Sequence, residues 1–137
     1  MTRWIENVSA DAVAGGCHTD MGPNALLIQI MDPARLFPMP KHDFKVIVQF
    51  EFLDAEDEDD YPDECKISDT DAASLVEWLK YAQEKHMNVL VHCFAGICRS
   101  GAVVEVGESM GFTGTGRFRE PNQRVLTKMQ NYLKATE

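Results

Sequence analysis

Apolar runs along the chain predict four β-strands separated by polar or turn-forming stretches. Residues 25–31 (ALLIQIM) are bounded on both sides by Pro-containing turns, and residues 44–52 (FKVIVQFEF) are rich in β-branched and aromatic side chains. The stretch 31–45 between them predicts a loop. Residues 89–91 lie inside a short apolar run, NVLVH, that stops abruptly, and residues 3–8 are a weaker candidate. The 44–52 and 89–91 runs are typical of buried strands.

Three segments carry apolar residues at helical spacing. The first begins at the helix-starting residues 68–71 and ends near Lys85. The second, 100–110, is mostly small and apolar, which predicts a largely buried helix that stops at Gly111. The third follows Pro121, a residue suited to a first helical turn. The apolar positions of the first and third helices are Ala72, Leu75, Val76, Leu79, Ala82, Val125, Leu126, Met129, Tyr132 and Leu133.

The alternation of strands and helices predicts an α/β fold with a central, mostly parallel sheet flanked by helices. Functional sites in such sheets lie at the carboxyl ends of the strands. The chain has 137 residues and 15.4 kDa, which is enough for one domain with its own core. Because it contains no internal repeat and no flexible linker, we expect residues 1–137 to form a single domain.

Charge and composition narrow the classes of function. Lys and Arg total 13 against 22 Asp and Glu, and the net charge of −9 repels a phosphate backbone, so no nucleic-acid partner is expected. The chain has no cationic stretch followed by an apolar run at its start, and no window reaches the roughly 18 apolar residues of a membrane span. Its four cysteines form no secreted-type framework. We therefore expect a soluble cytoplasmic protein with free thiols and no membrane partner.

The segment 91–101 (VHCFAGICRSG) stands between a buried strand and a buried helix and combines several reactive residue types. A loop that turns from strand to helix points backbone N–H groups inward, and the helix N-terminus adds partial positive charge, so the loop suits a tetrahedral anion. The planar guanidinium of Arg99 can hold two oxygens of such an anion, and Gly96 suits a mid-loop position with positive φ. The same surroundings favour the thiolate of Cys93, which places a nucleophile in an oxyanion site.

This segment resembles the His-Cys-x5-Arg-Ser/Thr signature of the cysteine-dependent protein tyrosine and dual-specificity phosphatases, and Gly96 falls where the dual-specificity branch has a glycine. The order of elements over residues 44–111 is also similar to that branch, and the helix start at 121–122 looks like the closing helix of compact microbial members. The resemblance implies a three-layer dual-specificity-phosphatase-like fold and no metal or organic cofactor. It also implies a phosphorylated protein or peptide as substrate and binding of phosphate-like oxyanions.

The resemblance implies a role for each residue of the loop. Cys93 attacks phosphorus and becomes a phosphocysteine, His92 fixes the loop and helps to keep the thiol ionised, and Ser100 stabilises the departing thiolate. The Arg99 side chain and the loop amides bind the phosphate oxygens. The phosphate-binding residues are Phe94, Ala95, Gly96, Ile97, Cys98 and Arg99.

The same chemistry needs an aspartic acid that protonates the leaving oxygen and later activates water. In the family this residue follows the strand before the long helix, often two residues beyond an aromatic, and Phe52-Leu53-Asp54 has that form. Asp54 is the first candidate and Asp57 the second. Both belong to residues 54–64, of which eight in eleven are acidic, a composition typical of a solvated loop. The other candidates in this run are Asp59, Asp60 and Asp63.

Two further features of the loop refine the hypothesis. The Cys93-x4-Cys98-Arg-Ser spacing resembles the low-molecular-weight tyrosine phosphatases, in which paired cysteines form a reversible disulfide; here Cys98 either forms such a disulfide or fills the underside of the loop. Phosphoinositide phosphatases tend to carry basic loop residues, whereas Phe94, Ala95 and Ile97 are neutral. Phosphorylated protein side chains are therefore favoured. Pocket depth decides between phosphotyrosine, the first candidate, and phosphoserine or phosphothreonine.

The main alternative is a catalytically weak pseudophosphatase, which keeps the oxyanion site for binding phosphoproteins but has no working general acid. A zinc site is a weaker alternative, because the chain has no Cys-x2-Cys or His-x3-His spacing. The residues from which such a site would be drawn are Cys17, His18, Cys65 and His86.

Overall fold

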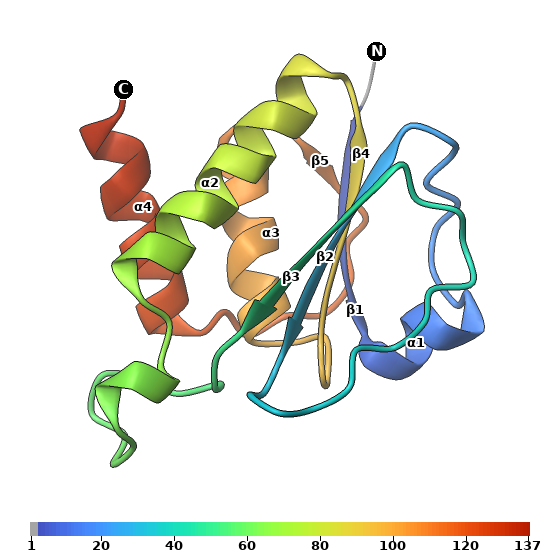
Figure 1. The fold of residues 1–137 in the computed structure, drawn as a ribbon. Helices are drawn as coiled ribbons and strands as arrows, with labels where there is room; N and C mark the ends of the chain where they lie inside the picture. Colours follow the sequence, from blue (N-terminus) through green and yellow to red (C-terminus); the bar gives the residue numbers. More distant parts are fainter. Residues whose placement is uncertain (1–2) are drawn as a thin grey trace.

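The computed structural model describes residues 3–137, which contain one sheet of five parallel strands (Figure 1). The strands are β1 (Trp4–Ser9), β2 (Ala25–Met31), β3 (Val46–Glu51), β4 (Asn88–Cys93) and β5 (Thr113–Gly114). Their spatial order is β3-β2-β4-β1-β5, and all four neighbouring pairs run parallel. The expected α/β sheet is therefore confirmed.

Residues 3–137 also form four α-helices and one short 3-10 helix. They are α1 (Ala10–Gly15), η1 (Asp63–Cys65), α2 (Asp69–Glu84), α3 (Arg99–Ser109) and α4 (Gln123–Ala135), of which α4 follows the last strand. The three predicted helices are confirmed: their starts, and the ends predicted for the first two, agree with the structure to within two residues. Ser68 begins α2, because its side chain accepts a hydrogen bond from the backbone N–H of Asp71, and Asn122 begins α4 by accepting one from Val125. None of the helices among residues 3–137 is long and apolar enough to cross a membrane.

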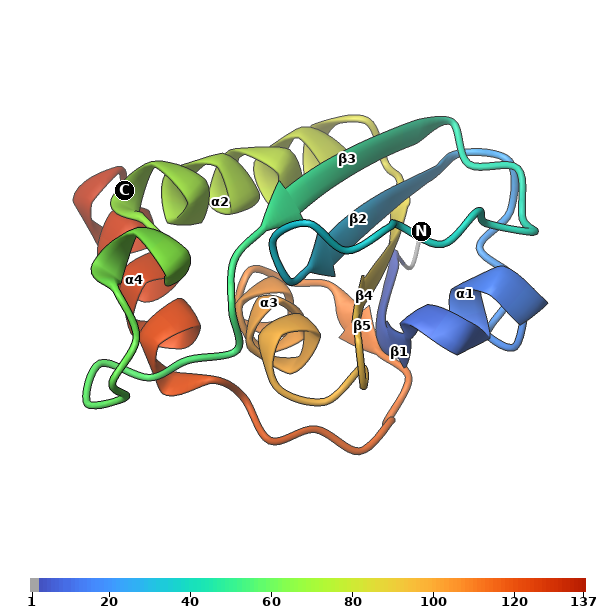
Figure 2. The same cartoon turned by 60° about the horizontal axis from the view of Figure 1, so that its bottom comes forward.

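The helices form two layers on opposite faces of the sheet (Figures 1 and 2). On one face, α2, α3 and α4 cover the larger core, which includes Ile28, Leu75 and Val103. On the other face, α1 and the loops before β2 and β3 cover a smaller core, which includes Val13 and Leu27. The central strands β2 and β4 are buried on both faces, which explains their nearly continuous apolar sequences.

Strand β3 corrects one sequence-based prediction. Residues 44–52 were expected to form a buried strand, but β3 is an edge strand, and among residues 3–137 it pairs only with β2. Its residues alternate in exposure, and Ile47 is 44% exposed because helices cover only one face of the sheet there. Alternating apolar and polar positions are typical of a strand with one solvated face. The prediction of burial was therefore wrong for this strand.

The short elements α1 and β5 had no clear signal in the sequence. Helix α1 has six residues, too few to show a helical period, and it is defined by its ends: the Ser9 side chain accepts from the N–H of Ala12, and Gly16 at φ 70° closes it. Strand β5 has two residues and pairs with β1. Such elements depend on tertiary contacts more than on their own sequences.

The parallel pairing brings the carboxyl ends of four strands to one edge of the sheet. Ser9 at the end of β1 pairs with Cys93 at the end of β4, and Met31 at the end of β2 pairs with Glu51 at the end of β3. Segments that are far apart in the sequence therefore meet at this edge, which comes forward in Figure 2. The segment 91–101 lies there, as expected for a functional site in a parallel sheet.

Candidate active site

The loop between β4 and α3 turns sharply against the end of β1. Gly96, in the middle of the loop, has φ +77°, a conformation that side chains other than glycine rarely adopt. A Cβ atom at this position would lie 2.2 Å from the carbonyl carbon of Val8 and 2.4 Å from the backbone nitrogen of Ser9. The expected positive φ is therefore confirmed, and the backbone of β1 leaves room only for glycine.

Cys93 is the last residue of β4, and its side chain is 2% exposed. The backbone N–H of Gly96 donates to the Cys93 Sγ at 3.3 Å, and the hydroxyl Oγ of Ser100 lies 3.2 Å from the same sulfur. Hydrogen-bond donors and the nearby N-terminus of α3 stabilise a negative charge on sulfur. The loop therefore places a backbone N–H and a hydroxyl group against the Cys93 sulfur.

Two contacts from β1 and α1 hold this loop in place. The buried side-chain amide of Asn7 donates to the carbonyl of Gly96 at 2.8 Å and to that of Phe118 at 3.0 Å. The N–H of Ala10, the first residue of α1, donates to the carbonyl of Phe94 at 3.1 Å. These contacts restrain the loop. The role of Asn7 had no signal in the sequence, because its partners lie 89 and 111 residues away.

His92 is fully buried beneath the loop. Burial lowers its pKa to about 4, and the positive charge of Arg99 also lowers it, so the imidazole is neutral near pH 7. Its Nδ1 lies 3.3 Å from the carbonyl oxygen of Cys93, and a neutral ring with a proton on Nδ1 donates to that oxygen. His92 can therefore hold the loop, but it supplies no positive charge to the thiolate.

Arg99, the first residue of α3, is 4% exposed. Its guanidinium donates hydrogen bonds to two residues, one directly after β2 and one directly after β3. Its Nη1 donates to Oδ1 of Asp32 at 2.7 Å and to the carbonyl of Phe52 at 2.8 Å. Its Nε is buried and has no partner within residues 3–137. A buried guanidinium N–H without an acceptor is unfavourable, so this edge suits a bound oxyanion.

The candidate general acids occupy different positions. Asp54 follows β3, is exposed, and accepts a hydrogen bond at 2.8 Å from the side-chain amide of Asn122, the capping residue of α4. Asp57 pairs with Arg124 of α4 at 2.7 Å, and Asp59 accepts from the backbone of Glu56 at 2.7 Å. Asp54 also makes a side-chain hydrogen bond with the loop residue Cys98.

Cys98 lies on the side of the loop that faces Asp54. Burial, the negative charge of Asp54 and a hydrogen bond to Asp54 together raise the pKa of the Cys98 thiol to about 11. The thiol is therefore protonated near neutral pH. All four cysteines are free, so the Cys93–Cys98 disulfide stays a prediction.

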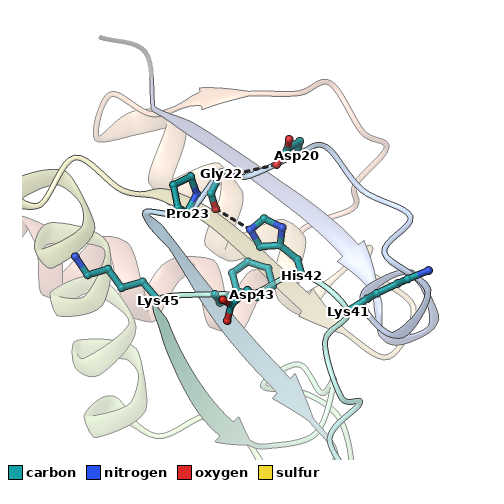
Figure 3. A pocket seen from close by; sticks show the side chains of 8 residues that line it. Asp20, Gly22, Pro23, Lys41, His42, Asp43 and Lys45 are labelled. Atoms are coloured by element: carbon teal, nitrogen blue, oxygen red, sulfur yellow. Dashed lines mark hydrogen bonds between the residues drawn. The ribbon is translucent and has the colours of Figure 1, made fainter.

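A hollow away from the cysteine loop is shown in Figure 3. It has a volume of about 690 Å³ and lies before the starts of β2 and β3, at the edge of the sheet opposite to Cys93. In Figure 3, His42 points toward the carbonyl of Gly22, with which its Nε2 makes a hydrogen bond of 2.7 Å. No cluster of three or more potential metal ligands occurs within residues 3–137. This hollow therefore contains none of the residues of the cysteine loop.

Comparison with known proteins finds a likeness of structure rather than of sequence. No family model and no curated protein sequence matches the chain, whereas 18 solved chains match its structure. Human DUSP28 has a TM-score of 0.61 at 17% sequence identity and covers 97% of this chain and 95% of its own. A mouse protein classed as a dual-specificity phosphatase and crystallised with zinc tungstate has a TM-score of 0.59 at 19% identity, over 93% of this chain and 80% of its own.

A third neighbour is a human tyrosine phosphatase-like serine/threonine/tyrosine-interacting protein, with a TM-score of 0.54, 19% identity, and coverage of 85% of this chain and 91% of its own. At these identities the likeness concerns the fold. The chain therefore has the fold of the dual-specificity phosphatases, and the three-layer fold implied by the signature segment is confirmed.

Proposed function

We propose that this chain, which has the dual-specificity phosphatase fold, is a phosphatase that hydrolyses phosphotyrosine in proteins, and phosphoserine or phosphothreonine as well. The observation that carries the proposal is the arrangement of one loop. A buried cysteine with hydrogen-bond donors on its sulfur lies at the start of the loop, and a buried arginine with an unpartnered N–H lies at its end. The loop thus contains a nucleophile and oxyanion donors, the two groups that phosphoryl transfer requires.

The first step transfers the phosphoryl group to the enzyme. The Cys93 thiolate attacks phosphorus in line, an S–P bond forms, and the bond from phosphorus to the side-chain oxygen of the substrate breaks. Arg99 and the loop amides stabilise the charge on the phosphoryl oxygens. The carboxylic acid of Asp54 gives its proton to the leaving oxygen, so that the product leaves as a neutral alcohol or phenol.

The second step regenerates the enzyme. The Asp54 carboxylate removes a proton from a water molecule, whose oxygen attacks phosphorus as the S–P bond breaks. The electron pair returns to Cys93, where the Ser100 hydroxyl, 3.2 Å away, donates to the departing thiolate. The products are inorganic phosphate and enzyme with Asp54 protonated again. No step requires a metal or an organic cofactor.

The surroundings of the loop favour a protein substrate over a multiply charged headgroup. The Phe94 side chain, next to the nucleophile, is 54% exposed and has the guanidinium of Arg35 over its ring at 5.0 Å. A cavity of about 480 Å³ beside them is lined in part by Met31, Leu36 and Pro38. A mostly apolar rim suits the aromatic ring and flanking chain of a phosphotyrosine peptide better than an inositol polyphosphate.

The alternative function is phosphoprotein binding without efficient catalysis. It is favoured by one observation: Asp54 is exposed and held by Asn122 near Cys98, and no described contact joins it to Cys93. One neighbour in the fold comparison is itself described as an interacting protein. Such a module keeps the oxyanion site and has no acid in reach of the leaving oxygen.

Hydrolysis of p-nitrophenyl phosphate without added metal separates the two functions. The enzyme proposal predicts turnover in the wild type, inhibition by vanadate, and loss of turnover in Cys93→Ser. Phosphotyrosine, phosphoserine and phosphothreonine peptides of one sequence then rank the substrates. Asp54→Ala is expected to lower hydrolysis of the peptides by about 10²- to 10⁴-fold, the usual contribution of a general acid. A folded wild type that binds vanadate or a phosphopeptide but hydrolyses none of these compounds would support the binding module instead.

A further inference from the structure

Asp32 lies directly after β2, and its carboxylate contacts the arginine of the signature loop. Its Oδ1 accepts a hydrogen bond from Nη1 of Arg99 at 2.7 Å, and the carbonyl of Phe52, directly after β3, accepts from the same nitrogen at 2.8 Å. The Arg99 side chain is 5% exposed and the Asp32 side chain 32%. The ends of two neighbouring strands thus hold one nitrogen of a buried guanidinium.

The contact with Asp32 decides which edge of the guanidinium remains for a ligand. Nη1 of Arg99 is occupied by protein acceptors, whereas Nε is buried without a partner in the described chain. A guanidinium binds an oxyanion best through two neighbouring N–H groups of its planar fork. With Nη1 held by β2 and β3, the edge that includes Nε is the one available to an anion in the loop.

We propose that Asp32 is a positioning residue for oxyanion binding: it fixes the rotation of the Arg99 guanidinium so that its Nε edge is presented to the anion bound in the cysteine loop. The proposal rests on the proposed function, because it assumes that the loop binds phosphate-like groups. Without this contact, the long Arg99 side chain would lose rotamer freedom when the anion binds, and this entropy loss would weaken binding. The contact with Asp32 orders the side chain before the anion binds.

Asp32 has a second cationic neighbour, which the test must separate from the first. Its Oδ2 lies 3.7 Å from Nε of Arg35, whose guanidinium stacks over the exposed ring of Phe94. The Arg35 side chain is 55% exposed, so this longer contact is screened by solvent. The buried contact with Arg99 is shorter and therefore dominates the effect of Asp32.

The test compares Asp32→Asn with the wild type in three measurements: vanadate affinity, inorganic phosphate affinity, and kcat with KM for p-nitrophenyl phosphate. Loss of a charge-assisted hydrogen bond to Arg99 is expected to weaken vanadate binding and lower kcat by about 10- to 100-fold. Phosphate affinity is expected to change less, because vanadate adopts the five-coordinate geometry of the transition state, which depends more on the placement of Arg99. Asp43→Asn, at the opposite edge of the sheet, is the matched control and is expected to leave all three values unchanged.

A double-mutant cycle identifies the residue through which Asp32 acts. In an Arg99→Ala background, Asp32→Asn is expected to have no further effect, whereas in an Arg35→Gln background it keeps its full effect. Wild-type vanadate affinity and kcat in Asp32→Asn, a rise in kcat, or full additivity with Arg99→Ala would each overturn the proposal. A wild type that binds vanadate without turnover would refute the proposed function alone, since vanadate affinity still tests Asp32. A wild type that binds no vanadate would refute both.

Discussion

Asn122 contacts the Asp54 segment, the start of α4 and the loop residue Cys98. Two different substitutions of Asn122 distinguish its effect on stability from its effect on acid catalysis. The side chain is 3% exposed. Its Nδ2 donates to Oδ1 of Asp54 at 2.8 Å and to the carbonyl of Ala55 at 3.2 Å, and its Oδ1 accepts from the N–H of Val125 at 3.0 Å as the cap of α4. Its backbone N–H donates to the carbonyl of Cys98 at 2.9 Å, a contact that any substitution other than proline keeps.

The magnitude follows from these bonds. Asn122→Ala removes the cap, which is worth about 1 kcal/mol, and leaves the buried carbonyl of Ala55 without its side-chain donor, which costs about 1 kcal/mol more. Asn122→Ser keeps a capping oxygen and loses the amide, so its loss of stability is expected to be about half as large. In a chain of this size a loss of 1 kcal/mol lowers the melting temperature by roughly 3 to 6 °C.

Both variants remove the hydrogen bond to Asp54, so both are expected to impair acid catalysis to the same degree although their stabilities differ. The assay compares p-nitrophenyl phosphate, whose leaving group needs little protonation, with phenyl phosphate, whose leaving group needs more. The ratio of the two kcat values is expected to rise by about 10-fold in both variants, a part of the usual contribution of a general acid. A ratio that stays at the wild-type value in both variants would refute the placement of the acid at Asp54.

Two further predictions concern the loop and the residue beneath it. Gly96→Ala is expected to abolish vanadate binding, because its Cβ would lie 2.2 Å from the backbone of Val8. Gly22→Ala, also at positive φ but with no atom within 4 Å of the added Cβ, is the control and is expected to keep vanadate binding. Equal vanadate affinities in the two variants would contradict the loop geometry. His92 has its pKa lowered from 6.5 to about 4 in the folded state, so the unfolded state binds more protons between these pH values. Stability is therefore expected to fall, on the order of 3 kcal/mol, as the pH decreases from about 6.5 to about 4. Urea unfolding across this range measures the slope, and a His92→Asn variant with the slope of the wild type would contradict its assignment to His92.

Local patterns predicted much of the fold and the centre of the site. The runs at residues 25–31 and 89–91 and the capped amphipathic helices carry their signals within a few neighbouring residues, and the structure confirms them. The positive φ of Gly96 was also predictable, because a short loop from strand to helix requires such a residue. The burial of β3 was not, because its apolar sequence does not show that it lies at the edge of the sheet.

The supporting contacts of the site could not be predicted, because they join residues far apart in the sequence. Asp32 lies 67 residues from Arg99, and Asn122 lies 68 residues from Asp54. The parallel order of the strands brings Asp32, Arg99 and Asp54 to one edge, and the start of α4 brings Asn122 there. The neutral state of His92 depends in the same way on its burial in the folded protein, which the sequence does not record.

The most direct test of the proposed mechanism is to trap the covalent intermediate on Cys93. The wild type and Asp54→Asn are mixed with p-nitrophenyl phosphate, quenched rapidly with acid, digested, and analysed by mass spectrometry for a phosphorylated peptide. The proposed mechanism predicts a phosphoryl group on Cys93, at a higher level in Asp54→Asn because the second step is slowed, and none in Cys93→Ser. Turnover without any phosphorylated Cys93, or a phosphoryl group on another residue, would contradict the central role of this cysteine.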